Sequence, residues 1–125
     1  MKTENLLRKA MEVRKKAYAP YSGFKVGASI LSNKGKIYTG ANIENRVNGL
    51  SVCAEQVALF KGITEGEKSF KKLAVVAKGK IPYPCGACRQ ILHEHAPQIE
   101  IIVSDHEGNY EEMPLKKLLP FPFDI

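Results

Sequence analysis

The sequence lacks any apolar run long enough to cross a membrane, since no stretch of its 125 residues approaches about 18 consecutive apolar residues. Residues 1–12 carry mixed charge without an apolar core, so we expect no secretory signal. Cysteine is also scarce, and three thiols cannot all pair, which excludes a disulfide scaffold. These absences favour a small cytoplasmic protein whose thiols stay reduced.

Internal repeats, low-complexity tracts and linkers are likewise lacking, so we expect one domain spanning 1–125. Hydrophobic residues make up 44% and charged residues 26% of the chain, which is enough to bury a core and unlike a disordered sequence. The net charge of +6 could suit nucleic acid, but basic residues spread along a chain are equally typical of a solvated surface. We interpret the charge as a solvated surface and therefore expect no nucleic-acid partner. Because no long apolar run is present, we also expect no membrane partner.

Hydrophobic spacing predicts an α/β architecture. Helical spacing or helix-start signals mark four segments, at 6–17, 53–65, 85–95 and 114–119. Alternation over 24–30 and 37–41, with a turn at 33–35, predicts a β-hairpin. The unbroken apolar runs 73–77 and 99–103 are typical of parallel strands covered on both faces. Together with an optional fifth strand between the turn at 105–109 and the last helix, these segments predict a three-layer α/β/α fold around a single mixed sheet of about five strands.

The three cysteines occur in two motifs that both coincide with expected helix starts. Cys53 begins the motif Cys-Ala-Glu, while Cys85 and Cys88 belong to Pro-Cys-Gly-Ala-Cys. The i, i+3 spacing of Cys85 and Cys88 places both thiols on one face of a first helical turn. Unpaired amides and the helix dipole stabilise thiolates at such positions. Three thiolates presented to one point would make a good Zn²⁺ site.

A structural zinc, buried free cysteines or a redox pair are the alternatives to a catalytic zinc. A closed structural site needs four ligands, and the remaining candidates are histidines. His93 and His95 follow on the same expected helix, about 7.5 and 10 Å further along its axis, and His106 lies beyond the next strand. We therefore expect three protein ligands and an open fourth position, which is the arrangement of a catalytic zinc.

Glu55 strengthens the catalytic interpretation. It stands two residues after Cys53 in a first helical turn, where it could reach a water at the metal without binding the metal itself. A first-turn glutamate that merely complements the helix dipole is the alternative. A redox Cys-x-x-Cys pair would not account for a carboxylate at this position. The combination of Glu55 with three cysteines favours catalysis.

These motifs resemble the three-cysteine form of the zinc deaminase signature, and the chain is similar to the small homotetrameric zinc-dependent cytidine deaminase family. The similarity runs from Tyr18 to Phe123. Besides the cysteine motifs, the segments that carry it are 18–28, 42–45 and 88–90. It implies that Cys53, Cys85 and Cys88 hold one Zn²⁺ per chain. It further implies that Glu55 shuttles protons while water attacks C4 of a cytosine ring, giving uridine or deoxyuridine.

The resemblance also implies a set of substrate contacts. The backbone at Ala54 would hold the base edge, Phe24 would pack on the base, and Asn42 and Glu44 would bind ribose hydroxyls. Taken alone, Phe24 is typical of a core residue, Asn42 of a turn and Glu44 of a solvated surface.

The C-terminal residues complete the resemblance. In the family an aromatic residue near this end enters the site of a neighbouring subunit, and Phe123 matches it by position. Phe121 is a second candidate, and a plug in the chain's own core is the alternative. A homotetramer is therefore expected, with a nucleoside as the small-molecule substrate.

Two departures from the family pattern bear on the chemistry. Gln56 stands where many relatives have Arg, so it can donate hydrogen bonds to a thiolate but brings no charge. We hypothesise that the helix N-termini and Arg89 offset the charge of the thiolates instead. Asn48 stands where relatives usually have Tyr, and Arg46 and Val47 beside it are unusual as well. This segment borders the expected sugar pocket.

Two other functions remain open at this point. One is a deaminase acting on a different cytosine-containing nucleoside or an antibiotic of the blasticidin S type, which the presence of Asn48 leaves open. The pairing of Asn42 with Glu44 favours a ribose-like sugar instead. The other is a non-catalytic zinc module. Polynucleotide deaminases more often carry His as the first ligand, whereas this chain has Cys53.

Overall fold

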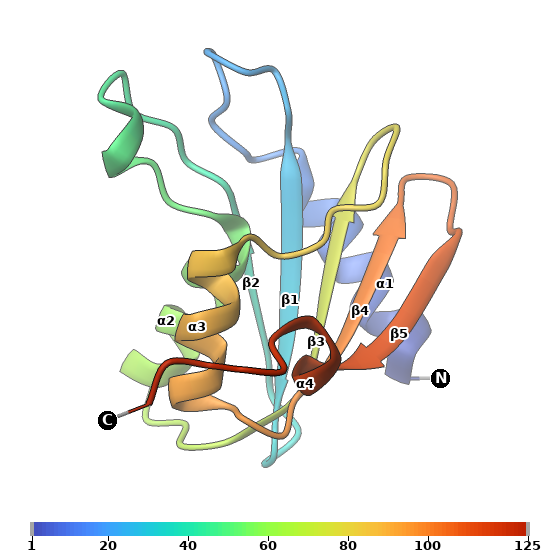
Figure 1. The fold of residues 1–125 in the computed structure, drawn as a ribbon. Coiled ribbons are helices and arrows are strands. Elements are labelled where there is room, and N and C mark those ends of the chain that lie inside the picture. Colours follow the sequence, from blue (N-terminus) through green and yellow to red (C-terminus); the bar gives the residue numbers. More distant parts are fainter. Residues whose placement is uncertain (1, 125) are drawn as a thin grey trace.

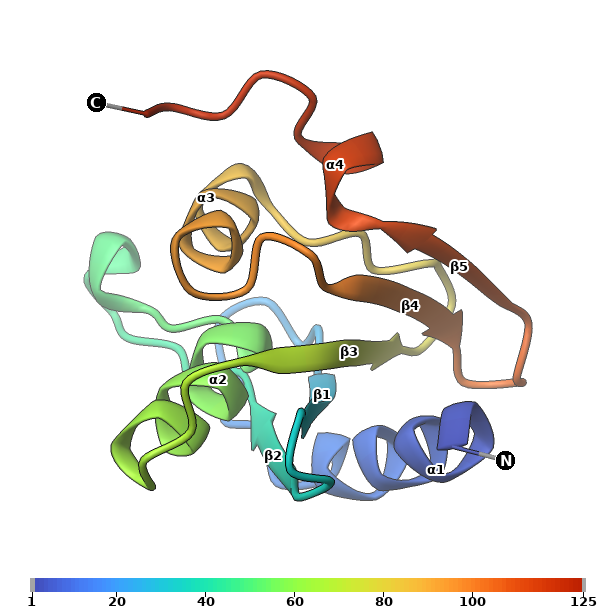
Figure 2. The ribbon, with the colours of Figure 1, turned by 90° about the horizontal axis from the view of Figure 1, so that it is seen from below.

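The computed structural model describes residues 2–124, which form one five-stranded sheet with helices on both faces (Figures 1 and 2). The elements in chain order are α1 (Lys2–Arg14), β1 (Val26–Ser32), β2 (Ile37–Ala41), the 3₁₀ turn η1 (Asn48–Leu50), α2 (Ala54–Thr64), β3 (Phe70–Ala77), α3 (Gly86–His95), β4 (Glu100–Asp105), β5 (Tyr110–Pro114) and α4 (Leu115–Leu118). The expected three-layer α/β/α fold is confirmed. No helix among these residues combines the length and the apolar character needed to cross a bilayer.

The sheet is mixed, with strand order β2-β1-β3-β4-β5. The hairpin predicted around the turn at 33–35 is confirmed, because β1 and β2 pair antiparallel and Gly35 adopts φ 92° in the turn. The two unbroken apolar runs are confirmed as parallel neighbours, with Leu73 of β3 opposite Ile101 of β4. β1 is antiparallel to β3, and β5 is antiparallel to β4.

Two hydrophobic clusters lie on opposite faces of the sheet. The larger cluster packs α2 and α3 against the sheet and includes Ala58, Leu59, Leu73, Val75, Leu92, Ile101 and Val103. The smaller cluster packs α1 against the other face and consists of Leu6, Ala10, Leu31, Ala74, Val76 and Ile102. Every residue of β1 is buried, in contrast to the alternation expected there, because helices cover this inner strand on both faces (Figure 2).

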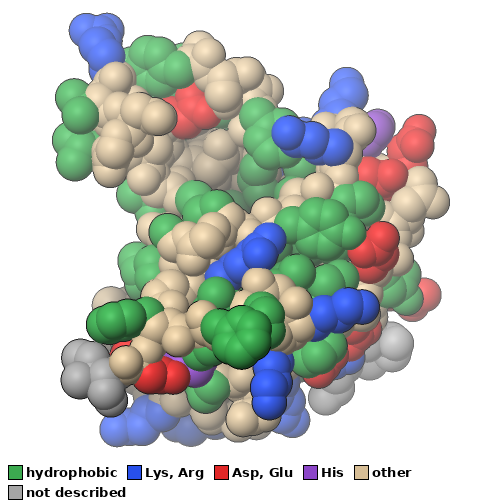
Figure 3. Space-filling view, viewed as in Figure 1, with side chains coloured by type: hydrophobic (Ala, Val, Ile, Leu, Met, Phe, Trp, Pro, Cys, Tyr) green, Lys and Arg blue, Asp and Glu red, His purple; other side chains and the backbone are tan. Residues whose placement is uncertain are grey.

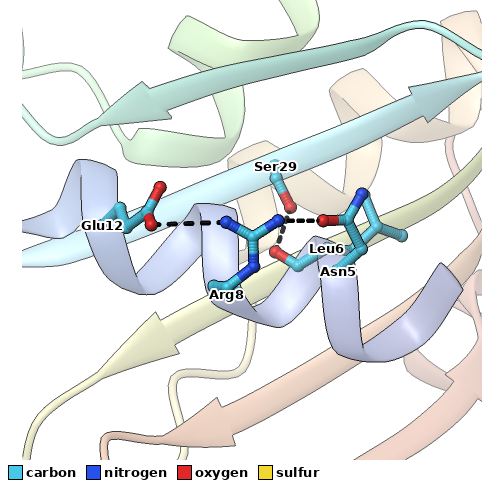
Figure 4. A network of polar contacts seen from close by, with 5 residues as sticks. All are labelled: Asn5, Leu6, Arg8, Glu12 and Ser29. Atoms are coloured by element: carbon cyan, nitrogen blue, oxygen red, sulfur yellow. Dashed lines mark hydrogen bonds and ion pairs between the residues drawn. The ribbon is translucent and has the colours of Figure 1, made fainter. Parts of the chain in front are cut away.

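A buried hydrogen bond fastens α1 to the sheet. The Ser29 hydroxyl of β1 donates to the Leu6 carbonyl at 2.6 Å, so a polar side chain inside the core has its partner (Figure 4). On the exposed side of the same helix, Arg8 pairs with Glu12 at 3.4 Å and hydrogen-bonds Asn5. This outer network adds little stability because exposed ion pairs contribute at most about 1 kcal/mol.

Element boundaries differ from the sequence expectation at several ends, for example at the first helix, the hairpin and the last helix. The prediction that the first helix includes Ala17 was wrong: α1 ends at Arg14, and a turn follows in which the Ala17 amide bonds the Arg14 carbonyl. The next residue, Tyr18, leaves the helical path to form a bridge with Ile43. The hairpin begins at Val26 rather than at residue 24, and the last helix spans Leu115–Leu118 rather than 114–119.

Gly27 allows α1 to lie close to β1, and this approach generates a stability prediction. A Cβ at residue 27 would meet the Ala10 carbonyl oxygen at 2.0 Å and the Arg14 amide nitrogen at 2.8 Å, which are backbone atoms that cannot rotate away. Gly27→Ala should therefore lower the free energy of unfolding by about 3 kcal/mol, measured by urea denaturation.

Gly49→Ala is the matched control, because a Cβ there has nothing within 4 Å. It should leave the free energy of unfolding within about 0.5 kcal/mol of the unmodified protein. Equal stability of the two variants would contradict the close approach of α1 to β1.

Candidate active site

Two helix N-termini carry the thiols. Cys53 is the N-cap of α2, with φ −76° and ψ 153°, and Cys85 is the N-cap of α3, with φ −69° and ψ 169°. Neither side chain caps its own helix, so both thiols are free for other partners. Cys88 lies in the first turn of α3. All three thiols therefore stand where unpaired amides and the helix dipole stabilise negative charge.

The distances between the sulfur atoms fit a tetrahedral zinc. The Cys85 sulfur lies 3.9 Å from that of Cys53 and 3.6 Å from that of Cys88, and all three sulfurs lie within 4.8 Å of one another. Sulfurs bound at about 2.3 Å to one tetrahedral zinc would be about 3.8 Å apart. Within residues 2–124, no His, Asp or Glu joins this group. The donor set is three soft thiolates, which zinc accepts readily.

Burial and mutual contact shift the pKa values at the site. A hydrogen bond from Cys88 lowers the pKa of the Cys53 thiol to about 6, and the same pairing together with burial raises the pKa of Cys88. Glu55 is only 6% exposed, and this burial, with a smaller contribution from nearby Cys53, raises its carboxyl pKa to about 7. The site thus combines a ready thiolate with a carboxyl group that is kept out of water.

A pocket of about 420 Å³ opens beside the thiols. The structure brings together in its lining most of the residues predicted for the site, and the full lining is Phe24, Val26, Asn42, Cys53, Ala54, Glu55, Lys80, Ile81, Pro82, Tyr83 and Cys85. Figure 3 shows this face hollowed between the arm of residues 42–52 and the loop that joins β3 to α3. The volume suits a small organic molecule.

Asn42 and Phe24 are joined at the edge of the pocket. The Asn42 amide accepts a hydrogen bond from the Val26 amide at 2.8 Å and donates one to the Phe24 carbonyl at 2.9 Å. The Phe24 ring has the Lys80 ammonium 4.8 Å from its centroid, a cation–π contact. Asn42 therefore holds the start of β1 in place, and half of its hydrogen-bonding capacity remains for other partners.

Glu44 does not line this pocket. Its carboxylate accepts hydrogen bonds from the Tyr21 amide at 3.0 Å and the Ser22 amide at 3.1 Å, and also from the Ser22 hydroxyl. The Ser22 hydroxyl, with these amides, holds the Glu44 pKa below its ordinary value. Glu44 instead lines a separate hollow of about 180 Å³, together with Asn48.

The C-terminal aromatics point away from the core of their own chain. Phe123 is 73% exposed and Phe121 is 90% exposed, so neither is a core plug. The backbone of Phe123 is held by Gln90, whose side-chain amide donates to the Phe123 carbonyl at 2.9 Å and accepts from the Phe123 amide at 3.0 Å. His93 contacts Asp124 at 2.9 Å in the same segment. The C-terminal segment is thus fastened along α3 (Figure 1).

Gln56 and Arg89 support the thiols in different ways. The Gln56 side-chain amide lies 3.5 Å from the Cys88 sulfur, within the range for a hydrogen bond to sulfur. The Arg89 guanidinium donates to the carbonyls of Pro84 at 2.7 Å and Leu118 at 2.9 Å. Arg89 therefore fixes the backbone beside Cys85, and its hydrogen bonds go to carbonyl oxygens rather than to a thiol.

One wall of the pocket was not predicted from the sequence, and it is formed by Lys80, Ile81, Pro82 and Tyr83. Its position in the sequence could have indicated this wall, because the segment leads directly into the Pro-Cys-Gly-Ala-Cys motif and its side chains therefore lie near the thiols. Its composition alone indicated only a loop.

Comparison with known proteins agrees with this geometry. Residues 1–104 match the family model described as the cytidine and deoxycytidylate deaminase zinc-binding region, which places the chain among zinc-binding deaminases. The cytidine deaminase of Sporosarcina psychrophila is 43% identical over 98% of this chain and 92% of its own length. The chain belongs to the cytidine deaminase family.

Solved structures extend the comparison to the fold. The crystal structure of cytidine deaminase from Burkholderia pseudomallei superposes with a TM-score of 0.94 at 40% identity, covering 98% of this chain and all of that one. The cytidine deaminase from Mycobacterium tuberculosis superposes with a TM-score of 0.88 at 33% identity, covering 100% of this chain and 99% of that one. The predicted cytidine-deaminase-like fold and zinc cofactor are confirmed.

The contact between Gln56 and Cys88 generates a prediction for metal binding. Gln56→Ala removes a hydrogen-bond donor from a thiolate sulfur, so the affinity for zinc should fall about tenfold, measured by competition with a chelating dye. Gln98→Ala, the same change at an exposed glutamine, should leave zinc affinity unchanged. Equal affinity in Gln56→Ala and the unmodified protein would refute this role for Gln56.

Proposed function

We propose that the protein catalyses the hydrolytic deamination of cytidine and deoxycytidine to uridine and deoxyuridine, with release of ammonia. The observation that carries this proposal is a cluster of three thiols beside a pocket that two of them, Cys53 and Cys85, line together with the buried carboxyl group of Glu55. A structural zinc site needs no acid beside it and no cavity. A hydrolytic site needs both, because a water and a substrate must meet a group that transfers protons.

The proposed ligands are Cys53, Cys85 and Cys88. Zinc bound there would supply Lewis acidity, which makes water nucleophilic at neutral pH. Glu55 takes the proton of the attacking water and delivers it to N3 of the cytosine ring as the new bond to C4 forms. Glu55 then transfers the proton of the new C4 hydroxyl to the amino nitrogen, the bond from C4 to that nitrogen breaks, and ammonia leaves while C4 becomes the carbonyl carbon of uridine.

Other pocket residues orient the base. We place the pyrimidine ring against Phe24, with the backbone at Ala54 holding its edge and the free hydrogen-bonding positions of Asn42 meeting the sugar. Glu44 lies in the separate hollow that it shares with Asn48, where it would reach a hydroxyl of a sugar that extends beyond the pocket. Gln56 donates to the Cys88 sulfur, and Arg89 donates to the Pro84 carbonyl and so holds the backbone before Cys85.

A second candidate substrate follows from Asn48. This residue shares the hollow of Glu44, so a substrate with a different sugar or an extended substituent would meet it there. A modified nucleoside or an antibiotic of the blasticidin S type is such a substrate. The hollow is small, about 180 Å³, which favours an ordinary sugar.

A homotetramer and a cytoplasmic location complete the proposal. Exposed Phe121 and Phe123 on a fastened C-terminal segment support a contact with a neighbouring subunit, in which Phe123 enters the neighbour's pocket. Unpaired thiols support a reducing compartment.

Activity against a substrate panel tests the proposed reaction. The zinc-loaded protein is incubated with cytidine, deoxycytidine, 5-methylcytidine, cytosine and blasticidin S, and ammonia release is measured. Cytidine and deoxycytidine should be the best substrates. Glu55→Gln should retain one zinc per chain and lose about 10²- to 10⁴-fold in kcat, because the proton carrier is gone.

Glu65→Gln, the same change at an exposed glutamate at the end of α2, should have full activity. No ammonia from any nucleoside would overturn the proposed function, and blasticidin S as the best substrate would replace it with the second candidate. Loss of zinc and fold in Glu55→Gln would make Glu55 structural.

Co-expression of two variants tests whether Phe123 acts in the pocket of a neighbouring subunit. Phe123→Ala alone should raise KM about tenfold, because stacking of a base on an aromatic ring contributes about 1–3 kcal/mol. Co-expression with Glu55→Gln chains should restore part of the activity, since a Phe123→Ala subunit keeps Glu55 and receives Phe123 from its neighbour. If co-expression restores no activity, or if an active monomer sediments, Phe123 does not act in the pocket of a neighbouring subunit.

A further inference from the structure

The wall of the pocket that precedes Cys85 is a stiff segment. Pro82 and Pro84 each have a fixed φ and restrict the residue before them. Between them, the Tyr83 amide donates to the Ile81 carbonyl at 3.2 Å, which closes a tight turn. The segment from residue 81 to 85 supplies the lining residues Ile81, Pro82 and Tyr83 and also the thiol of Cys85. A displacement of Tyr83 would therefore move the wall against which a ligand in the pocket packs.

The outer side of this segment is held by residues that take no part in the pocket. The Tyr83 hydroxyl donates to a Glu111 carboxylate oxygen at 2.5 Å, and Glu111 belongs to β5 at the edge of the sheet. Nearby, the Gly79 amide donates to Nδ1 of His106, which follows β4. On the inner side, Lys80 lies over the Phe24 ring. The β4–β5 hairpin thus supports the loop from outside, while Phe24 supports it from the pocket.

We propose that Glu111 is a positioning residue for substrate binding: by holding the Tyr83 hydroxyl, it fixes the wall of residues 81–85 against which the nucleoside packs. The inference rests on the proposed function for the identity of the ligand. Glu111 itself does not line the pocket. It acts through Tyr83 alone, so it affects the fit of the substrate more than the proton transfers at Glu55.

The character of the bond supports this role. A phenol hydroxyl that donates to a carboxylate makes a charge-assisted hydrogen bond, which is stronger than a neutral one. Tyr83 is 45% exposed, so close packing does not enclose its ring and the hydrogen bond to Glu111 helps to fix it. Most exposed hydrogen bonds have no consequence for function. This one differs because its donor lines the pocket and belongs to a segment whose backbone is already restricted by two prolines.

A double-mutant cycle tests the proposal. Glu111→Ala and Tyr83→Phe should each raise KM for cytidine about fivefold, the factor that matches one hydrogen bond of ordinary strength, with kcat within about twofold of the unmodified protein. The double variant should show the same KM as either single variant, because both changes remove the same bond. Glu111→Gln, whose amide oxygen still accepts from the phenol, should restore most of the affinity.

Glu112→Ala is the matched control. Glu112 is the next residue of β5, carries the same charge and pairs with Lys72 at 3.3 Å, away from the pocket. This variant should keep the KM of the unmodified protein. Deuterium uptake by a peptide covering residues 78–86 provides a readout without substrate: it should increase in Glu111→Ala and Tyr83→Phe and stay unchanged in Glu112→Ala.

The outcomes separate this inference from the proposed function. If the unmodified protein deaminates cytidine but KM is unchanged in Glu111→Ala, or if the two single effects add, the positioning role is wrong. An equal rise of KM in Glu112→Ala would also overturn it, because the effect would then come from β5 as a whole. An unmodified protein that does not act on nucleosides would overturn the proposed function, while deuterium uptake would still show whether Glu111 holds the loop.

Discussion

The meeting of two helix N-termini at one edge of the sheet is the constraint on which the site depends. β2 and β3 are both antiparallel to β1, so these two strands run in the same direction and their carboxyl ends lie at the same edge. The helices α2 and α3 that follow them therefore begin near each other (Figure 1). Cys53 and Cys85 are the caps of these two helices, which is why thiols 32 residues apart come within 3.9 Å.

Close packing makes this arrangement precise. A Cβ at Gly40 would meet the Ala58 amide nitrogen at 2.5 Å, so the absence of a side chain on β2 lets α2 lie directly against the strand. The position of α2 along the sheet fixes Cys53 and Glu55 together, because both belong to its first turn. Burial of Glu55 then follows from the packing of α2 against the sheet, and no separate structural feature is needed for it. The same packing that stabilises the fold thus keeps the carboxyl group out of water.

Much of this could be predicted from the sequence because the signals were local. The i, i+3 cysteines, the turn before β2 and the apolar runs of β3 and β4 each follow from periodicity or spacing within a short segment. Ala17 continued the helical spacing, but its helix ends at Arg14, because the backbone at Tyr18 pairs with Ile43, a contact that is distant in sequence. No local pattern can report such a contact.

The contacts that support the site could not be predicted either, because they join residues that are distant in sequence. Gln90 with Phe123, and Tyr83 with Glu111, join residues far apart in the chain, and only the folded arrangement shows them. The resemblance to a family predicts Glu44 as a sugar contact, which stays a prediction, and the structure adds that its carboxylate accepts a hydrogen bond from the Ser22 amide. Motifs thus identified the chemical groups, while the walls and supports that position them depend on the tertiary fold.

In the proposed reaction, the thiols and Glu55 together direct a water molecule to C4 of a cytosine ring. The most direct measurement is the mass of uridine formed from cytidine by the zinc-loaded protein in water enriched in oxygen-18. Each uridine should contain one oxygen-18 atom, located at C4, and one ammonia should be released with it. Cytidine recovered unchanged from protein that holds its zinc, or uridine without the heavy oxygen, would contradict the account.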